Sequence, residues 1–178
     1  MIEYHVGNLF EVIKDLPSGK TIIIPHICND IGGFGAGFVV HLAKTFPIVK
    51  ECYREWHRTG KWGEDSKFKL GSVQFINCAH VDATWHDKSV CVCNMIAQQG
   101  VVGPNNPNPI KYSALAKCLL EVGNKMNHIV DFEVHTCAFG SGLAGGNWSF
   151  IKELIDETLP STTHIYTLTE QERLMLGT

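Results

Sequence analysis

Three side chains suited to acid–base or binding chemistry lie close together in the chain, at His26, Asn29 and Asp30. An imidazole exchanges a proton near neutral pH, so His26 could act as a general acid or base. A carboxylate can orient or deprotonate water, so Asp30 could act as a general base. Each also has a structural interpretation: His26 as a satisfied histidine of a strand or core, and Asp30 as a cap of its own loop. Asn29 is best suited to binding.

These side chains open a glycine-rich segment, residues 29–37 (NDIGGFGAG), and a second one follows at residues 139–147 (FGSGLAGGN). Each follows an apolar, strand-like run and precedes a predicted helix. The first amides of a helix are unpaired, and glycines let the backbone approach a phosphate closely. Two such loops facing one crevice could clamp a diphosphate, although glycines also make ordinary tight turns. Neither loop is a Walker A sequence or a clean Gly-x-Gly-x-x-Gly fingerprint.

The loops need strands and helices to position them, and the apolar periodicity supplies both. Strands are predicted at residues 3–6, 21–27, 71–78, 89–96, 129–138 and 163–168, and helices at 9–16, 38–46, from 47, at 110–126, 148–159 and after 168. This alternation predicts a three-layer α/β/α sandwich with a mixed, mostly parallel sheet of about six strands. Two successive strands in the middle allow an antiparallel member. No linker interrupts the chain, so we expect a single domain over residues 1–178.

Composition narrows the range of partners. The 178 residues carry a formal net charge of −3, with 44% hydrophobic and 19% charged residues, and no run of Lys or Arg forms a patch. A nucleic-acid backbone normally binds to a basic face, so nucleic acid is a disfavoured partner. Binding of RNA or poly(A) is therefore a third alternative, weaker than the two other functions considered below. A small anion held by backbone amides needs no basic patch.

Other sequence features indicate an ordinary intracellular protein. The seven Cys are scattered, as expected for reduced thiols, and the nine His show no metal-ligand spacing, so we expect neither a metal site nor a cofactor. The first residues do not form a signal peptide, and no apolar run reaches the roughly 18 residues of a membrane span. The sequence therefore predicts a cytoplasmic protein without membrane contact, and we expect a monomer.

Three segments together resemble a known family. Residues 7–10 (GNLF), 26–38 (HICNDIGGFGAGF) and 140–146 (GSGLAGG) resemble the opening motif, first ligand loop and phosphate loop of macro domains. The resemblance extends from the first strand to the last. Within the family, the chain is most similar to the ADP-ribose-1″-phosphate processing proteins and the terminal ADP-ribose glycohydrolase branch. The resemblance implies a macro domain that binds ADP-ribose or an ADP-ribosylated small molecule or protein.

The resemblance also implies a binding site. Asn8 stands where macro domains usually carry an Asp that accepts from the adenine amino group, and it can still accept through its neutral carbonyl. Leu9 would offer its amide to the base, Asn29 would bind a distal-ribose hydroxyl, and Tyr166 would lie near the adenine. The remaining implied ligand contacts are Gly33, Gly35, Ala36, Gly37, Phe38, Gln98, Gly140, Ser141, Gly142, Leu143, Ala144 and Gly145.

The chain departs from the glycohydrolase branch at its catalytic positions. Gln98 (or Gln99) and Ala144 stand where that branch carries Lys and Asp, and neither can form a Schiff base or act as a carboxylate base. Asn29, Asp30 and His26 remain as catalytic candidates. The resulting hypothesis is hydrolysis at the 1″ position of ADP-ribose, as an ADP-ribose-1″-phosphate phosphatase or ADP-ribosyl ester hydrolase. The alternative is a reader module that binds ADP-ribose without chemistry.

Overall fold

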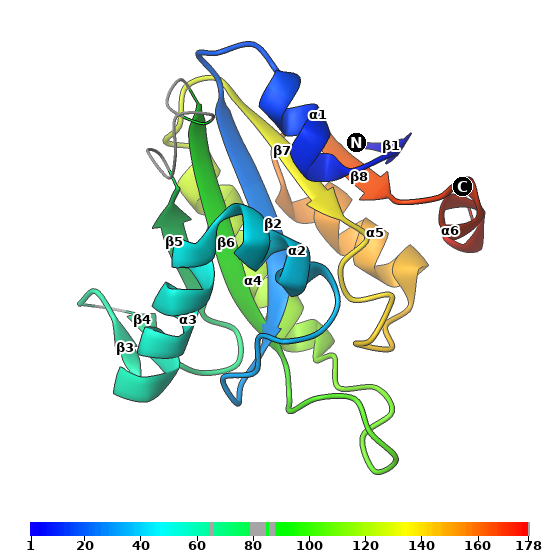
Figure 1. Ribbon diagram of the computed structural model, residues 1–178. Coiled ribbons are helices and arrows are strands. Elements are labelled where there is room, and N and C mark those ends of the chain that lie inside the picture. The colour runs from blue at the N-terminus through cyan, green and yellow to red at the C-terminus, as the bar shows by residue number, and fades with distance from the viewer. Residues whose placement is uncertain (65, 79–84, 86–87, 178) are drawn as a thin grey trace.

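A six-stranded sheet forms the centre of the protein in a computed structural model that describes residues 1–64, 66–78, 85 and 88–177 (Figure 1). The strand order is β1-β8-β7-β2-β6-β5. These strands are β1 (Ile2–Val6), β2 (Thr21–Asn29), β5 (Val73–Asn77), β6 (Ser89–Gln98), β7 (Phe132–Cys137) and β8 (Thr163–Thr167). Neighbours pair in parallel except β5, which is antiparallel to β6. A separate two-stranded ribbon joins β3 (Lys61–Trp62) to β4 (Ser66–Lys67).

Helices cover both faces of the sheet because its central strand is apolar on both sides. In β2, Ile22 and Ile24 pack in one core cluster and Ile23 in the other, as the two-residue period of a strand requires. One cluster contains residues from α1 (Leu9–Asp15), α2 (Phe38–Thr45) and α3 (Pro47–Thr59), and the other contains residues from α4 (Tyr112–Met126) and α5 (Trp148–Thr158). The short α6 (Glu170–Met175) follows β8. The predicted α/β/α sandwich with a mixed, mostly parallel sheet is confirmed.

Strands β2 and β7 pair over only part of their length. Their parallel ladder ends at Ile23 and Val134, although β2 continues to Asn29 and β7 to Cys137. Pro25 has no N–H to donate, and its carbonyl instead accepts a hydrogen bond from the Thr136 hydroxyl. The carboxyl halves of β2 and β7 are therefore not paired with each other. Open α/β sheets bind ligands beyond such strand ends.

Some element boundaries differ from the sequence-based prediction. The strand expected at residues 129–138 is shorter, because Asp131 has a left-handed φ of 58° that ends the preceding turn. The helix expected from residue 110 begins at Tyr112, since Ile110 forms a β-bridge with Gln98. Among the described residues, no helix is both long enough and apolar enough to cross a membrane.

Helix α4 crosses the end of α5 at a position that only glycine fits. A Cβ atom added at Gly123 would lie 2.2 Å from the Thr158 carbonyl oxygen. Ala is favoured over Gly in a helix by roughly 1 kcal/mol, but overpacking against backbone costs more. We expect Gly123→Ala to lower the free energy of unfolding by roughly 1–3 kcal/mol in urea titrations. The neighbouring exposed Asn124→Ala should be neutral or slightly stabilising, and equal stability of Gly123→Ala and wild type would contradict this packing.

Candidate functional site

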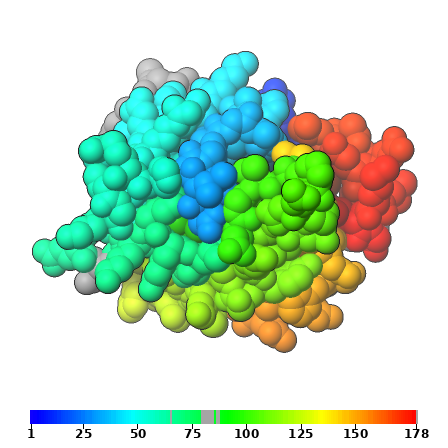
Figure 2. Space-filling view, turned by 90° about the horizontal axis from the view of Figure 1, so that it is seen from below, coloured from blue at the N-terminus to red at the C-terminus, as the bar shows by residue number. Residues whose placement is uncertain are grey.

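A cleft of about 1030 Å³ lies beyond the carboxyl ends of β2, β7 and β8. Figure 2 views the molecule from the loop side, where the loop after β2 (blue) lies beside the loop that follows β6 (green) and the C-terminal segment (red) stands to one side. The cleft is bordered by the loops after β2 and β7, the start of α1, and α6. The predicted ligand residues that line it are Asn8, Leu9, Gly35, Ala36, Gly37, Phe38, Gln98, Gly140, Ser141, Gly142, Leu143, Ala144 and Tyr166.

The loop after β2 presents unpaired backbone donors to the cleft. Gly37 is the N-cap of α2, has a φ of 73°, and provides no side-chain cap. Within the described part of the chain, the amide N–H groups of residues 35–39 donate to no protein acceptor. The first N–H groups of a helix have no intrahelical partner and lie at the positive end of its dipole. This side of the cleft can therefore bind an anion.

The loop after β7 presents a second set of donors. The N–H groups of residues 141–144 donate to no acceptor among the described residues. The turn is shaped by hydrogen bonds from the Gly145 amide to Gly142 and from the Gly146 amide to Gly140. Gly140 has a φ of 83°, and a Cβ there would lie 2.9 Å from the side chains of Ile110 and Ile151. Glycine is thus required for the loop to curl over the core and leave its amides exposed.

The cleft lining lacks permanently charged basic side chains among the described residues. Its described lining contains neither Lys nor Arg, and its ionisable side chains include His26, His41 and Glu172. The donors that this lining offers to a negative charge are therefore mainly backbone N–H groups, including those at the N-terminal end of α2. This explains how a chain of net charge −3 can still contain an anion site.

The start of α1 and the end of β8 form a third side of the cleft. The Asn8 side chain caps α1, with its Oδ1 accepting from the Phe10 amide at 3.0 Å. The Leu9 amide donates to no acceptor among the described residues. Tyr166 lies under this region, with its ring stacked on His5 at 5.0 Å and its hydroxyl 2.9 Å from His135 Nδ1. Burial raises the pKa of Tyr166 to about 12, so it remains a neutral phenol.

His26 lines the cleft as a buried ring held by a polar network. Its Nε2 lies 2.5 Å from Asn94 Oδ1, and the Asn94 amide nitrogen donates to Gln74 at 2.9 Å. Asn94 therefore presents its oxygen to His26, which fixes the proton on Nε2. Burial lowers the pKa of His26 from its usual 6.5 to about 4. The ring also packs against Phe34 and Phe38. These surroundings favour the structural interpretation of His26, as a neutral wall of the cleft.

Asn29 and Asp30 lie beside the cleft but are not among its described lining residues. Asn29 Oδ1 accepts from the Ile31 and Gly33 amides, and its Nδ2 donates to the Gly33 carbonyl at 2.7 Å. The Tyr53 hydroxyl holds the same residue, donating to its backbone carbonyl at 2.6 Å. Asn29 thus shapes the loop after β2 from within. The predicted contacts Gly33 and Gly145 are likewise outside the described lining.

The Asp30 carboxylate ties two loops together. Its Oδ1 accepts from the Gly100 amide at 2.7 Å, while its own amide donates to the Gln98 carbonyl. These bonds connect the loop after β2 to the loop after β6. The structure therefore gives Asp30 a positional role that differs from the self-capping considered from sequence.

Several cleft residues were missed by the sequence analysis. They include Val39, Val40 and His41 of α2, and Glu172 and Met175 of α6. One signal for α6 was present: Thr169 and Glu172 form a capping box, the pattern that marks a helix start. No local signal indicated that this helix would fold back over the cleft.

The comparisons with known proteins place this architecture in a family. No family model matches the chain. A solved macrodomain protein from Streptomyces coelicolor is 32% identical, with a TM-score of 0.67, over 94% of this chain and 99% of that one. A solved protein of unknown function from Bacteroides thetaiotaomicron is 35% identical, with a TM-score of 0.74, over 94% and 98% of the two chains. The fold and the cleft thus define an α/β/α protein with a backbone anion site, and the chain belongs to the macro domain family.

More distant similarities are partial or limited to fold. An uncharacterised 17.5 kDa protein of Enterobacteria phage T4 is 27% identical over 88% of each chain. An ADP-ribose 1″-phosphate phosphatase of Candida albicans is 36% identical over 56 residues, which are 32% of this chain and 35% of that protein. Thermosipho africanus DarTG, solved in complex with ADP-ribose, shares the fold at 16% identity with a TM-score of 0.62, over 81% of this chain and 37% of its own.

The buried His26 makes stability depend on pH. Its pKa is depressed in the folded state, so below 6.5 the unfolded chain binds a proton that the folded chain does not. The neutral His26 ring therefore contributes fully to the free energy of unfolding above pH 6.5, and this contribution is lost as the pH falls towards about 4. Between pH 7 and pH 5 this linkage costs about 2 kcal/mol of unfolding free energy.

We expect His26→Gln, which keeps a donor for Asn94, to lose less unfolding free energy than wild type between pH 7 and pH 5. Urea titrations at both pH values measure this difference. The exposed His128→Gln should retain the full sensitivity. An unchanged pH dependence in His26→Gln would show that this ring is protonated in the folded protein.

Proposed function

We propose that the cleft binds ADP-ribose, with the diphosphate between the loops after β2 and β7. The observation that carries this proposal is the pair of loops at residues 35–39 and 141–144. Among the described residues, their amides have no acceptor, and the cleft that they line contains no Lys or Arg. A diphosphate presents acceptor oxygens to both sides, so it can satisfy both sets of donors. The cleft volume of about 1030 Å³ accommodates a ligand of nucleotide size.

The third side of the cleft suits the adenine. The free Leu9 amide can donate to a ring nitrogen, and Asn8 Oδ1 retains a second lone pair for the exocyclic amino group after capping α1. The distal ribose then lies towards Phe38, Gln98 and the loop after β7. Known relatives support this choice of ligand: Thermosipho africanus DarTG, part of which shares the fold, was solved in complex with ADP-ribose, and two curated relatives are named ADP-ribose 1″-phosphate phosphatases.

A negative charge in the diphosphate position should abolish binding. Ala36 is exposed and lines the cleft among the free amides, so Ala36→Asp adds a carboxylate without disturbing the core. We expect ADP-ribose affinity in calorimetric titrations to fall roughly 100-fold or more, because the introduced carboxylate would lie next to the diphosphate and repel it. Ser113→Asp, at an exposed position of α4 outside the cleft lining, is the matched control and should bind as wild type. Equal affinities for Ala36→Asp and wild type would place the ligand elsewhere.

The finer proposal is that the protein hydrolyses a group at the 1″ position of bound ADP-ribose. The supporting observations are the partial similarity to ADP-ribose 1″-phosphate phosphatases and the position of Asp30 beside the cleft, where it is hydrogen-bonded to the loop that follows Gln98. In this scheme Asp30 acts as the base for water, and the leaving group is a phosphate or an ester-linked ADP-ribosyl acceptor.

A second candidate function, a reader without chemistry, is favoured by the hydrogen bonds of the same residues. Asn29 and Asp30 hold the loops, and His26 remains neutral at physiological pH. Gln98 and Ala144, at the family's catalytic positions, carry no ionisable group. Saturable ADP-ribose binding without phosphate release from ADP-ribose-1″-phosphate, and without cleavage of ADP-ribosyl esters, would identify the reader.

Asp30→Asn separates the two roles of this side chain. The amide keeps an oxygen that can accept from the Gly100 amide but removes the carboxylate base. If Asp30 activates water, turnover of ADP-ribose-1″-phosphate should fall at least about 100-fold while ADP-ribose affinity is retained. Asp15→Asn, at the exposed end of α1, should leave both unchanged. Full turnover by Asp30→Asn would remove Asp30 from the mechanism and leave it as a tie between loops.

A further inference from the structure

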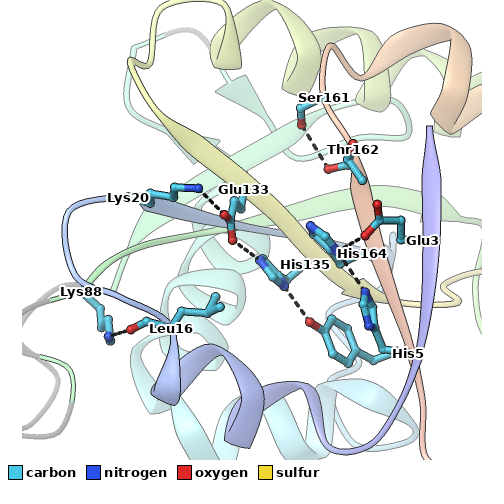
Figure 3. A network of polar contacts seen from close by, with 11 residues as sticks. Glu3, His5, Leu16, Lys20, Lys88, Glu133, His135, Ser161, Thr162 and His164 are labelled. Atoms are coloured by element: carbon cyan, nitrogen blue, oxygen red, sulfur yellow. Dashed lines mark hydrogen bonds and ion pairs between the residues drawn. The ribbon is translucent and has the colours of Figure 1, made fainter.

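A cluster of ionisable side chains lies on the sheet surface next to α1 and outside the lining of the cleft. Figure 3 shows Glu3 and His5 on β1, His164 on β8, and Glu133 and His135 on β7. Strand pairing creates this cluster, because Glu3 pairs with His164 in the β1–β8 ladder and His5 follows two residues later on the same face.

Three of these side chains bring possible metal-ligand atoms close together. His5 Nε2 is hydrogen-bonded to His164 Nδ1 at 3.0 Å, a contact that a bound ion would replace, and His164 Nδ1 lies 3.3 Å from Glu3 Oε2. All three ligand atoms fall within 4.8 Å of one another. A tetrahedral Zn²⁺ with bonds of about 2.0–2.1 Å separates its ligand atoms by about 3.3–3.4 Å, so an ion could bind with small side-chain movements.

The neighbouring group of Glu133, His135 and His164 is less suited to the same task. Both ring nitrogens of His135 are already engaged, Nδ1 by the Tyr166 hydroxyl and Nε2 by Glu133. Its ring is also stacked on His164 at 4.7 Å with an interplanar angle of 19°, so the in-plane lone pairs of the two rings do not converge on one point. His135 instead supports the His164 ring and leaves Nδ1 of His164 facing Glu3 and His5.

We propose that Glu3, His5 and His164, the β1–β8 triad, bind a divalent transition metal ion, Zn²⁺ by preference. Two imidazoles and one carboxylate select such an ion over Mg²⁺ or Ca²⁺, which prefer oxygen ligands alone. The site is accessible, since the Glu3 side chain is 51% and the His164 side chain 21% exposed. Water can supply the fourth ligand.

The ion would fasten the first strand of the chain to the last. Strand β1 is an edge strand that pairs only with β8 in the described sheet, and it leads directly to Asn8 and Leu9 in the cleft. A metal that binds only the folded protein raises its stability by mass action. None of the three triad residues lines the cleft, so metal binding at this strand pair does not require ADP-ribose.

The test is titration of tag-free, reduced wild-type protein with Zn²⁺ in a calorimeter, with Tm followed in parallel. We expect one ion per chain and a rise of several degrees in Tm at a roughly hundredfold excess over Kd. Glu3→Gln and His5→Gln should each weaken binding at least about tenfold and lose the rise in Tm. Glu3 is exposed, so its variant keeps the fold, and His128→Gln is the matched control that should bind as wild type.

The seven free Cys are the competing ligands, and Co²⁺ distinguishes them. Cobalt held by the triad gives ligand-field bands without thiolate-to-cobalt charge transfer. A thiolate charge-transfer band, equal Zn²⁺ affinity in wild type, Glu3→Gln and His5→Gln, or weaker binding in His128→Gln would each overturn the proposal. Unaltered ADP-ribose binding in Glu3→Gln would confirm that this site and the cleft are tested separately.

Discussion

The site depends on backbone N–H groups that find no acceptor among the residues that the structure describes. Most of these residues are exposed, so their amides are free to donate to water or to a ligand, and both sets border the same cleft. They exist because β2 and β7 stop pairing after Ile23 and Val134, which opens the sheet where both strands lead into glycine-rich loops. The two helices that follow add their positive ends. An anion site thus results from topology, in a protein with a net charge of −3.

The polar side chains around this site hold its backbone in place. Asn29 bonds the interior of the first loop, and Asp30 ties that loop to the Gly100 amide. His26, held by Asn94, forms a neutral wall that packs on the aromatic ring at the start of α2. Preorganised donors lose little entropy when a ligand arrives, so rigid loops favour binding. The same arrangement explains why residues that resemble catalytic candidates in the sequence can serve mainly to position amides.

Sequence alone predicted the layers and the two loops because both have local causes. The apolar run of β2 and the glycines of residues 35–37 and 140–146 are visible in short windows of sequence. What could not be predicted depends on distant segments. Asp30 meets Gly100 across 70 positions, and the lining from α6 depends on how the C-terminal residues fold back. His5 and His164 lie 159 positions apart, so no spacing rule for metal ligands could connect them.

The most direct test of the central claim is a ¹H–¹⁵N NMR titration with ADP-ribose, which observes each amide separately. The account predicts that the largest shifts occur at residues 35–39 and 141–144, followed by Leu9, because these N–H groups gain acceptors on binding. Amides of α4, behind the sheet, should not move. Saturable binding that leaves both loops unshifted, or shifts confined to another face, would contradict the assignment of the diphosphate to these loops.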